Sequence, residues 1–114
     1  YALIGAYKPE GEDWVDELCQ VLTENVETAY DFFEKKDGIR LQKPQGTYML
    51  FLDFEGWCRA HDKTMDELIC AGHEVGVYWQ DGRPFHGAYS IRMNLALPKS
   101  RVEEALRRLE KYVL

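Results

Sequence analysis

The chain has 114 residues, of which 46% are apolar and 30% charged, and its formal net charge is −6. These values are typical of one globular domain, so we expect a single domain over residues 1–114. Nucleic acids and anionic membranes are disfavoured as partners, because both are bound by basic surfaces. No apolar run is long enough to cross a bilayer.

The cysteines predict the cellular compartment, and the first residues favour a piece of a longer protein. The chain has three cysteines, an odd number, and no C-x-x-C motif, which predicts reduced thiols and a cytoplasmic location. It begins at Tyr1 inside an apolar segment, YALIGAY, that is typical of an element already under way. We therefore expect a piece of a longer protein; processing of a precursor would give the same start.

The first clear element is a long helix. Apolar residues recur at helical spacing through EDWVDELCQVLTENVETAYDFFEKK, residues 12–36. Acidic residues crowd its start, where the helix dipole favours negative charge, and Gly38 is expected to cap its end.

The middle of the chain predicts two strands, a loop and a short helix. IRLQK (39–43) alternates as a short strand, and TYMLFLDF (47–54) is apolar on both faces, like a central strand. A loop, EGWCRAHDK (55–63), follows. Thr64 and Glu67 then form a capping box that predicts a short helix ending at Gly72.

The last third predicts two strands and a final helix. VGVYW (75–79) is the first strand, and QDGRPFHG (80–87) is a polar loop with turn residues. YSIRMNLALP (89–98) is the second strand. Ser100 and Glu103 form a second capping box before an apolar helical stripe. The expected order is α-β-β-α-β-β-α, an α+β domain of two layers with a small, mostly antiparallel or mixed sheet covered by helices.

Arg92 occupies the centre of the 89–98 strand, a position that a guanidinium fills poorly unless it meets an anion. From the residues alone, three readings remain open. Arg92 pairs with a nearby carboxylate such as Asp53, it is exposed on an uncovered sheet face, or it holds a ligand carboxylate through two parallel hydrogen bonds. Mounting on a strand would fix such a binding group better than a loop would.

Other candidate sites are weaker. Cys58 with His61 and Cys70 with His73 form two C-x-x-H pairs, formally enough for tetrahedral zinc. Free cysteine is more often a small buried hydrophobe, so we expect no metal site. His86 lies in a loop next to the arginine strand and is more simply an exposed residue. No glycine-rich phosphate loop and no nucleophile motif is present, so we assign no catalytic residue.

Four stretches together resemble one protein family. KPQGTYMLFLDF, VGVYWQDGRPF, YSIRMNLALP and SRVEEALRRLEKYV occur in the order and spacing of the C-terminal small domain of class I/II aminotransferases. These are fold-type-I enzymes that use pyridoxal 5′-phosphate. The residues TYMLFLDF and QDGRPF, in the first and second stretches, are most similar to the cystathionine β-lyase-like branch of C–S lyases, and the resemblance covers nearly the whole chain.

The resemblance implies a role for Arg92. In the family, the arginine of the I-R-x-N motif binds the α-carboxylate of the amino-acid substrate, and Arg92 occupies that position here. Gly46, Thr47 and Tyr48 resemble the segment that runs near that arginine, and no contact is assigned to them. The loop 80–87 is expected to shape specificity for the substrate side chain. The resemblance also implies a large N-terminal domain as partner and a homodimer.

The resemblance also implies that this chain is not catalytic alone. In the family, the lysine that binds pyridoxal phosphate and the other cofactor-binding residues lie in the large domain. None of the seven lysines here has the apolar or cation-rich surroundings that lower a lysine pKa for such chemistry. We therefore expect no cofactor on this chain alone. The alternative is a free-standing α+β module that binds amino acids or regulates another protein.

Overall fold

A computed structural model describes all residues from 1 to 114. The elements in chain order are α1 (Ala2–Ala6), α2 (Pro9–Glu34), β1 (Arg40–Leu41), β2 (Met49–Asp53), α3 (Glu55–Ala60), α4 (Met65–Glu74), β3 (Gln80–Asp81), the 3₁₀ helix η1 (Arg83–Phe85), β4 (Ser90–Asn94) and α5 (Lys99–Tyr112). The expected α+β class is confirmed, but the element order is richer than α-β-β-α-β-β-α because α1 and α3 are additional helices.

The four strands form one sheet in the order β1-β2-β4-β3, and every neighbouring pair is antiparallel. The sheet is therefore wholly antiparallel. Of the two expected alternatives, mostly antiparallel or mixed, the structure agrees with the first. β2 and β4 occupy the centre, and Phe51 of β2 lies opposite Arg92 of β4. On the other side of β4, Gln80 of β3 also lies opposite Arg92.

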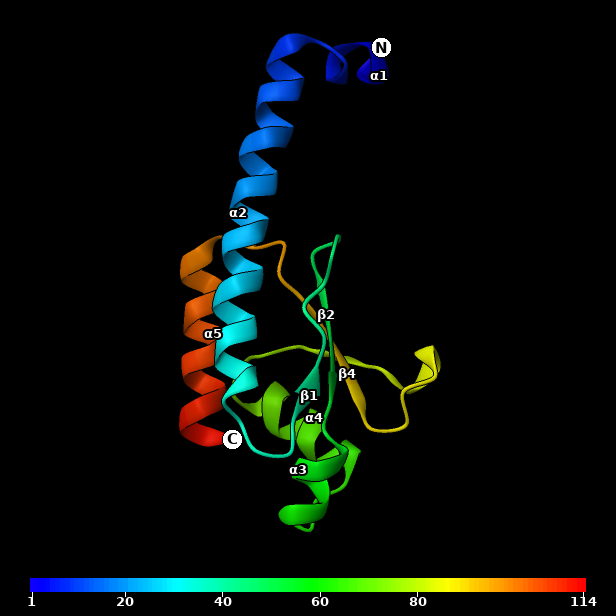
Figure 1. Ribbon diagram of the computed structural model, residues 1–114, viewed down its shortest axis with the longest axis vertical. Coiled ribbons are helices and arrows are strands. Elements are labelled where there is room, and N and C mark those ends of the chain that lie inside the picture. Colours follow the sequence, from blue (N-terminus) through cyan, green and yellow to red (C-terminus); the bar gives the residue numbers. More distant parts are fainter.

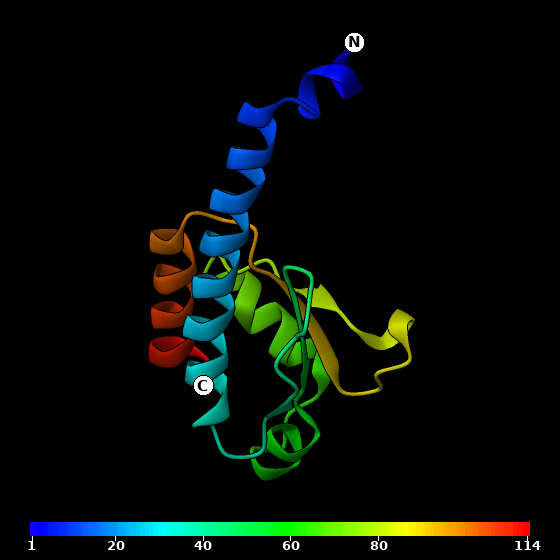
Figure 2. The same ribbon diagram turned by 45° about the horizontal axis from the view of Figure 1, so that its top comes forward.

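The helices α2 and α5 lie on one side of this sheet, and the short η1 lies on the other side (Figure 1). Leu50, Leu52 and Ile91 point to the side of α2 and α5 and are fully buried in the core. α2 and α5 pack side by side there, as both views show (Figure 2). Because successive strand residues alternate between faces, Phe51 and Arg92 belong to the opposite face. Phe51 keeps 43% of its surface exposed, because no α-helix covers that face.

Two predicted segments in the middle of the chain were wrong. Residues 75–79 do not form a strand; the strand comes later, at β3, and covers only two residues. Val77 and Trp79 are nevertheless buried, which explains the strand-like composition of a segment that packs without pairing. Residues 55–63 were expected as a loop, but α3 begins at Glu55 and buries Trp57 and Cys58.

The helix boundaries confirm one capping box and correct the other predictions. Thr64 and Glu67 form the reciprocal bonds of the predicted box at the start of α4. α4 continues past Gly72 to Glu74, and a Cβ at Gly72 would lie 2.3 Å from the Trp79 indole nitrogen. Glycine is therefore needed there for close packing rather than to end the helix.

At the last helix the predicted box of Ser100 and Glu103 is absent. α5 begins two residues earlier, with Pro98 rather than Ser100 as its N-cap and with no side-chain cap. The Pro98 carbonyl accepts hydrogen bonds from the backbone N–H groups of Arg101 and Val102. At the other end of the chain, α2 ends at Glu34, and Gly38 lies in the following turn with a φ of 79° rather than at the cap.

The long helix α2 has two unlike halves. Its buried residues begin at Asn25, and the turns before that project beyond the rest of the domain (Figure 1). Trp14, Val15 and Val21 are large exposed apolar residues on this projecting half. None of the helices has the length and apolar character needed to cross a membrane.

Candidate functional site

Arg92 lies at the middle of β4 on the face of the sheet that the helices leave open. Its neighbours across the two ladders are Phe51 and Gln80. Five of the seven arginines form ion pairs with carboxylates, and Arg92 and Arg101 are the two that do not. The Arg92 guanidinium is therefore a half-buried cation with no carboxylate partner within the chain.

The pairing of Arg92 with Asp53 does not occur. One Asp53 oxygen accepts a hydrogen bond from Arg40 at 2.7 Å, and the other accepts from the backbone N–H of Glu55 at 2.9 Å. Arg40 lies directly opposite Asp53 in the sheet, which makes it the nearer partner. The structural carboxylate considered for Arg92 is thus already occupied.

The Arg92 guanidinium contacts an aromatic ring instead. Its Cζ lies 3.9 Å from the centroid of the Phe85 ring, in cation–π geometry. Phe85 is the last residue of η1, and it is half-exposed at the surface. The loop 80–87 therefore does reach Arg92, through Phe85, whereas residue patterns alone assigned it no contact.

The loop that carries Phe85 is anchored by ionic hydrogen bonds. Arg83 donates its Nε–H to both oxygens of Asp81, at 3.0 and 2.9 Å, and an Nη2–H to Asp66 of α4 at 2.6 Å. The Asp81 carboxylate also accepts the backbone N–H of Arg83. These bonds from Arg83 lower the pKa of Asp81, and those from Asp81 and Asp66 raise the pKa of Arg83.

The two C-x-x-H pairs do not assemble into a metal site. Cys58 is buried with its Sγ 3.8 Å from the sulfur of Met65, and burial raises the pKa of its thiol. His61 stacks on Trp57 at 4.3 Å between ring centroids, and its Nδ1 lies 2.8 Å from the Trp57 carbonyl oxygen. No three His, Cys, Asp or Glu side chains are placed to hold one ion.

His86 and residues 46–48 form no side-chain hydrogen bond or ion pair with Arg92. His86 is exposed and adopts the left-handed conformation, with a φ of 65°, where it ends η1. Tyr48 lines a hollow with Val26 of α2, on the helical side of the sheet. Neither is a group that the structure directs at the guanidinium.

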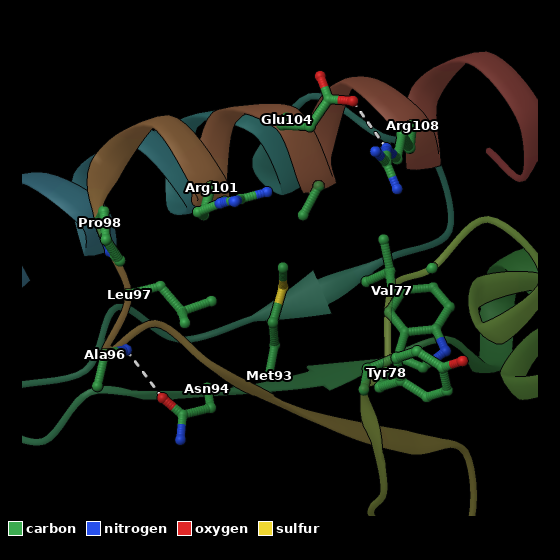
Figure 3. A pocket seen from close by; sticks show the side chains of 13 residues that line it. Val77, Tyr78, Met93, Asn94, Ala96, Leu97, Pro98, Arg101, Glu104 and Arg108 are labelled. Carbon is green, nitrogen blue, oxygen red and sulfur yellow. Dashed lines mark hydrogen bonds and ion pairs between the residues drawn. The ribbon is translucent and has the colours of Figure 1, made fainter.

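One hollow of the chain lies elsewhere, between α5 and the end of β4. It has a volume of about 590 Å³, and Arg92 does not line it. Figure 3 shows Arg101 lying beneath α5, with Met93 pointing up from β4 toward it. Arg108 is held at the rim by Glu104 at 2.7 Å. Arg101 is thus an unpaired arginine remote from the open sheet face.

No lysine of the chain is placed for covalent cofactor chemistry. Lys36 is the only one that is not exposed, and its Nζ lies 3.0 Å from Glu110 in an ion pair. A lysine that forms a Schiff base is activated by an apolar pocket or by a neighbouring cation. The 114 residues therefore do not fit the attachment of pyridoxal phosphate.

Taken together, the chain is an α+β domain that presents one arginine on the uncovered face of an antiparallel sheet. The family model described as "Aminotransferase class I and II" matches residues 1–109. The chain belongs to the class I and II aminotransferase family, and the resemblance inferred from its motifs is confirmed.

Individual relatives include both lyases and aminotransferases. The chain is 35% identical over 103 residues to cystathionine beta-lyase of Corynebacterium glutamicum, covering 88% of this chain and 26% of the relative. It is 30% identical to aspartate aminotransferase of Bacillus sp. (strain YM-2), covering 99% and 29%. The chain thus spans less than a third of the length of these relatives.

A solved structure shows the same fold. Cystalysin from Treponema denticola, which contains a pyridoxal 5′-phosphate cofactor, matches with a TM-score of 0.74 and 32% identity. The match covers 93% of this chain and 27% of cystalysin.

Phe85 is the site residue that sequence reasoning missed. The only signal was an aromatic residue in a polar, turn-rich loop, QDGRPFHG, where a phenyl ring has no obvious core to fill. Which side chain it would meet depends on how the loop folds back over the sheet, and the residue pattern does not specify that.

Proposed function

We propose that this chain is the C-terminal small domain of a longer pyridoxal-phosphate enzyme, an aminotransferase or C–S β-lyase that acts on amino acids. In that enzyme Arg92 binds the α-carboxylate of the substrate. The observation that carries the proposal is the free guanidinium of Arg92 on the open sheet face, in a chain whose relatives are such enzymes.

The chemistry of the guanidinium fits this ligand. Its planar fork of N–H donors holds a carboxylate by two parallel hydrogen bonds, which fixes orientation as well as position. A substrate held by its carboxylate presents its remaining bonds in a defined direction, and such orientation contributes to catalysis. Arg92 would therefore bind and orient, and no residue of this chain would transfer a proton.

The projecting half of α2 supports the placement in a longer protein. Trp14, Val15 and Val21 are exposed there. An upstream domain packed against this half would remove their apolar surface from water. The cofactor would be bound by that domain, because no lysine of this chain fits its attachment.

Location and assembly follow the same proposal. Three free cysteines agree with a reducing, cytoplasmic environment, and two of them, Cys19 and Cys70, are exposed. We infer a homodimer for the longer enzyme from its family alone. The isolated 114-residue chain is expected to be inactive.

The test is the Arg92→Ala variant of the longer enzyme. Loss of a charge-assisted, two-bond contact should weaken substrate binding by about 1.5–3 kcal/mol, or roughly ten- to hundred-fold in KM. Steady-state kinetics with L-amino acids that carry the α-carboxylate measure this effect.

The matched control is Arg101→Ala, which removes the other arginine that has no ion pair. It should leave KM within about two-fold. Equal kinetics of Arg92→Ala and the parent enzyme would refute the proposed role. Amino-acid binding by the 114-residue chain alone, measured by calorimetry, would favour a free-standing binding module instead.

A further inference from the structure

We propose that Phe85 is a positioning residue, which holds the Arg92 guanidinium in the orientation that binds a carboxylate. The loop 82–87 then serves as the rigid mount for its ring. The inference rests on the proposed function of Arg92 and adds a second residue to that site.

The contact itself restricts the arginine without using its donors. The Cζ atom of Arg92 lies over the Phe85 ring, 3.9 Å from its centroid. A ring that covers one face of a guanidinium leaves the N–H groups free, because these point outward in the guanidinium plane. The long side chain of Arg92 is thus held in place, while the pair of N–H donors that would bind a carboxylate stays available.

The other arginines show how a carboxylate partner would occupy the donors of Arg92. Arg40 and Arg59, for example, each donate to a carboxylate, at 2.7 and 2.6 Å. A carboxylate next to Arg92 would fix the guanidinium equally well, but it would occupy the donors that a substrate needs. An aromatic ring is the neighbour that orients a cation and does not compete with an anionic ligand.

The mount of the ring is fixed at both ends. The Gly82 N–H donates to the Ser90 carbonyl at 2.7 Å, and the Ser90 N–H donates to the Gly87 carbonyl at 3.0 Å. Between them, Arg83 is tied to Asp81 and to α4 through Asp66. The segment before Phe85, at Gly82 and Arg83, and the start of β4 after it, at Ser90, are therefore both held by hydrogen bonds.

Close packing allows the loop little freedom. Ser90 is only 5% exposed beneath it. A Cβ at Gly87 would lie 2.3 Å from the Ser90 hydroxyl oxygen and 2.7 Å from the Phe51 ring. The loop thus rests directly on the sheet beside Arg92, and Phe85 cannot move far from the guanidinium unless these contacts break.

The first test uses the 114-residue chain and needs no activity. In ¹⁵N-labelled protein, NMR measures the order of the Arg92 Nε–H bond and the ring-current shift of the Arg92 δ protons. We expect Phe85→Ala to abolish the shift and to reduce the order toward that of Arg101. Phe85→Tyr, which retains a ring face, should preserve both.

The control for this test is Tyr112→Ala, which removes another exposed ring that lies under a cation, the Lys111 ammonium at 4.8 Å. It should leave the Arg92 signals unchanged. Unchanged order of Arg92 in Phe85→Ala would overturn the positioning role, whatever the function of Arg92.

The second test is a double-mutant cycle in the longer enzyme. Phe85→Ala should raise KM for the amino-acid substrate roughly three- to thirty-fold and leave kcat nearly unchanged, because the carboxylate is held equally before and during the reaction. In the Arg92→Ala background the same change should have no further effect. Phe85→Tyr should restore the parent KM.

The outcomes separate this inference from the proposed function. An equal rise in KM from Phe85→Ala in both backgrounds would show that the ring acts independently of Arg92 and would overturn the inference. If Arg92→Ala leaves KM unchanged, the proposed function fails, and the NMR result still decides whether Phe85 orders Arg92.

Discussion

Asp53 has two arginines near its position in the sheet, and it pairs with only one. Arg40 is directly opposite in β1, whereas Arg92 is a diagonal neighbour, two residues from the Ser90 that faces Asp53 in β4. Diagonal neighbours lie about 7–8 Å apart, within reach of a long side chain. From the residues alone, Asp53 was one candidate partner of Arg92 and the pairing stayed open, because the choice depends on the position of β1, which covers only two residues.

This pairing predicts that Asp53 is dispensable for substrate binding. Asp53→Asn should leave KM of the longer enzyme within about two-fold, because the carboxylate it removes does not contact Arg92. It should lower the free energy of unfolding by about 1 kcal/mol, through the weakened bonds to Arg40 and Glu55. A KM change as large as that of Arg92→Ala would show that Asp53 acts on the substrate site.

At the scale of elements, prediction succeeded where a local signal decides the structure. The Thr64–Glu67 box marks the start of α4 because both reciprocal bonds lie within four residues. α3 was missed because the short stretch EGWCRAHDK is rich in polar residues and contains glycine, which favour a loop. It forms a helix where Trp57 and Cys58 are buried in the core. Residues 75–79 were misassigned because tertiary packing of Trp79 on Gly72, rather than strand pairing, explains their apolar composition.

The last helix carries a pH-dependent stabilisation centred on Glu104. Hydrogen bonds from Arg107 and Arg108 lower the pKa of this carboxyl from its ordinary value of 4.5 to about 2. A pKa lowered by folding stabilises the folded state fully above the unfolded value, and the contribution disappears as pH falls from about 4.5 to about 2.

Glu104→Gln tests this sign. The variant should unfold at lower denaturant concentration than the parent at pH 6, and the difference should shrink steadily between pH 4.5 and pH 2. Urea unfolding followed by circular dichroism measures both midpoints. Glu103→Gln on the same helix turn, outside the ion pairs, is the control and should show no such trend. A difference for Glu104→Gln that is constant with pH would exclude the ionic origin.

At the scale of the whole molecule, one buried amide joins the helical layer to the sheet. Asn25 of α2 is fully buried, and its Nδ2 donates to the carbonyls of Leu95 at 2.9 Å and Leu97 at 2.7 Å. These carbonyls follow β4, the strand that carries Arg92. The apolar stripe of the long helix predicted its buried face, but it gave no sign that a polar residue within it would fasten the end of a distant strand.

Replacing this amide should destabilise the entire domain. Asn25→Ala removes both hydrogen bonds, although the Leu95 carbonyl keeps a bond from the Leu97 N–H. We expect a cost of about 1–3 kcal/mol in the free energy of unfolding. Thr28→Ala, in the same helix, removes a hydroxyl that bonds only to Glu24 one turn earlier and should cost less than about 0.5 kcal/mol. Equal costs for the two variants would contradict the linking role of Asn25.

The sequence predicted one residue of the candidate site and missed another. The I-R-x-N motif identified Arg92 through its family, whereas its residue type and strand position alone could not distinguish a ligand from a structural partner. The structure removes Asp53 as that partner and adds Phe85, whose contact arises from loop folding that no short motif encodes.

The most direct measurement is a crystal structure of the longer protein with a bound amino-acid substrate analogue. We expect both oxygens of the analogue's α-carboxylate to lie about 2.7–2.9 Å from two nitrogens of Arg92, with the guanidinium still over the Phe85 ring. A carboxylate held by other residues, with Arg92 directed at solvent or at a carboxylate of the protein, would contradict this expectation.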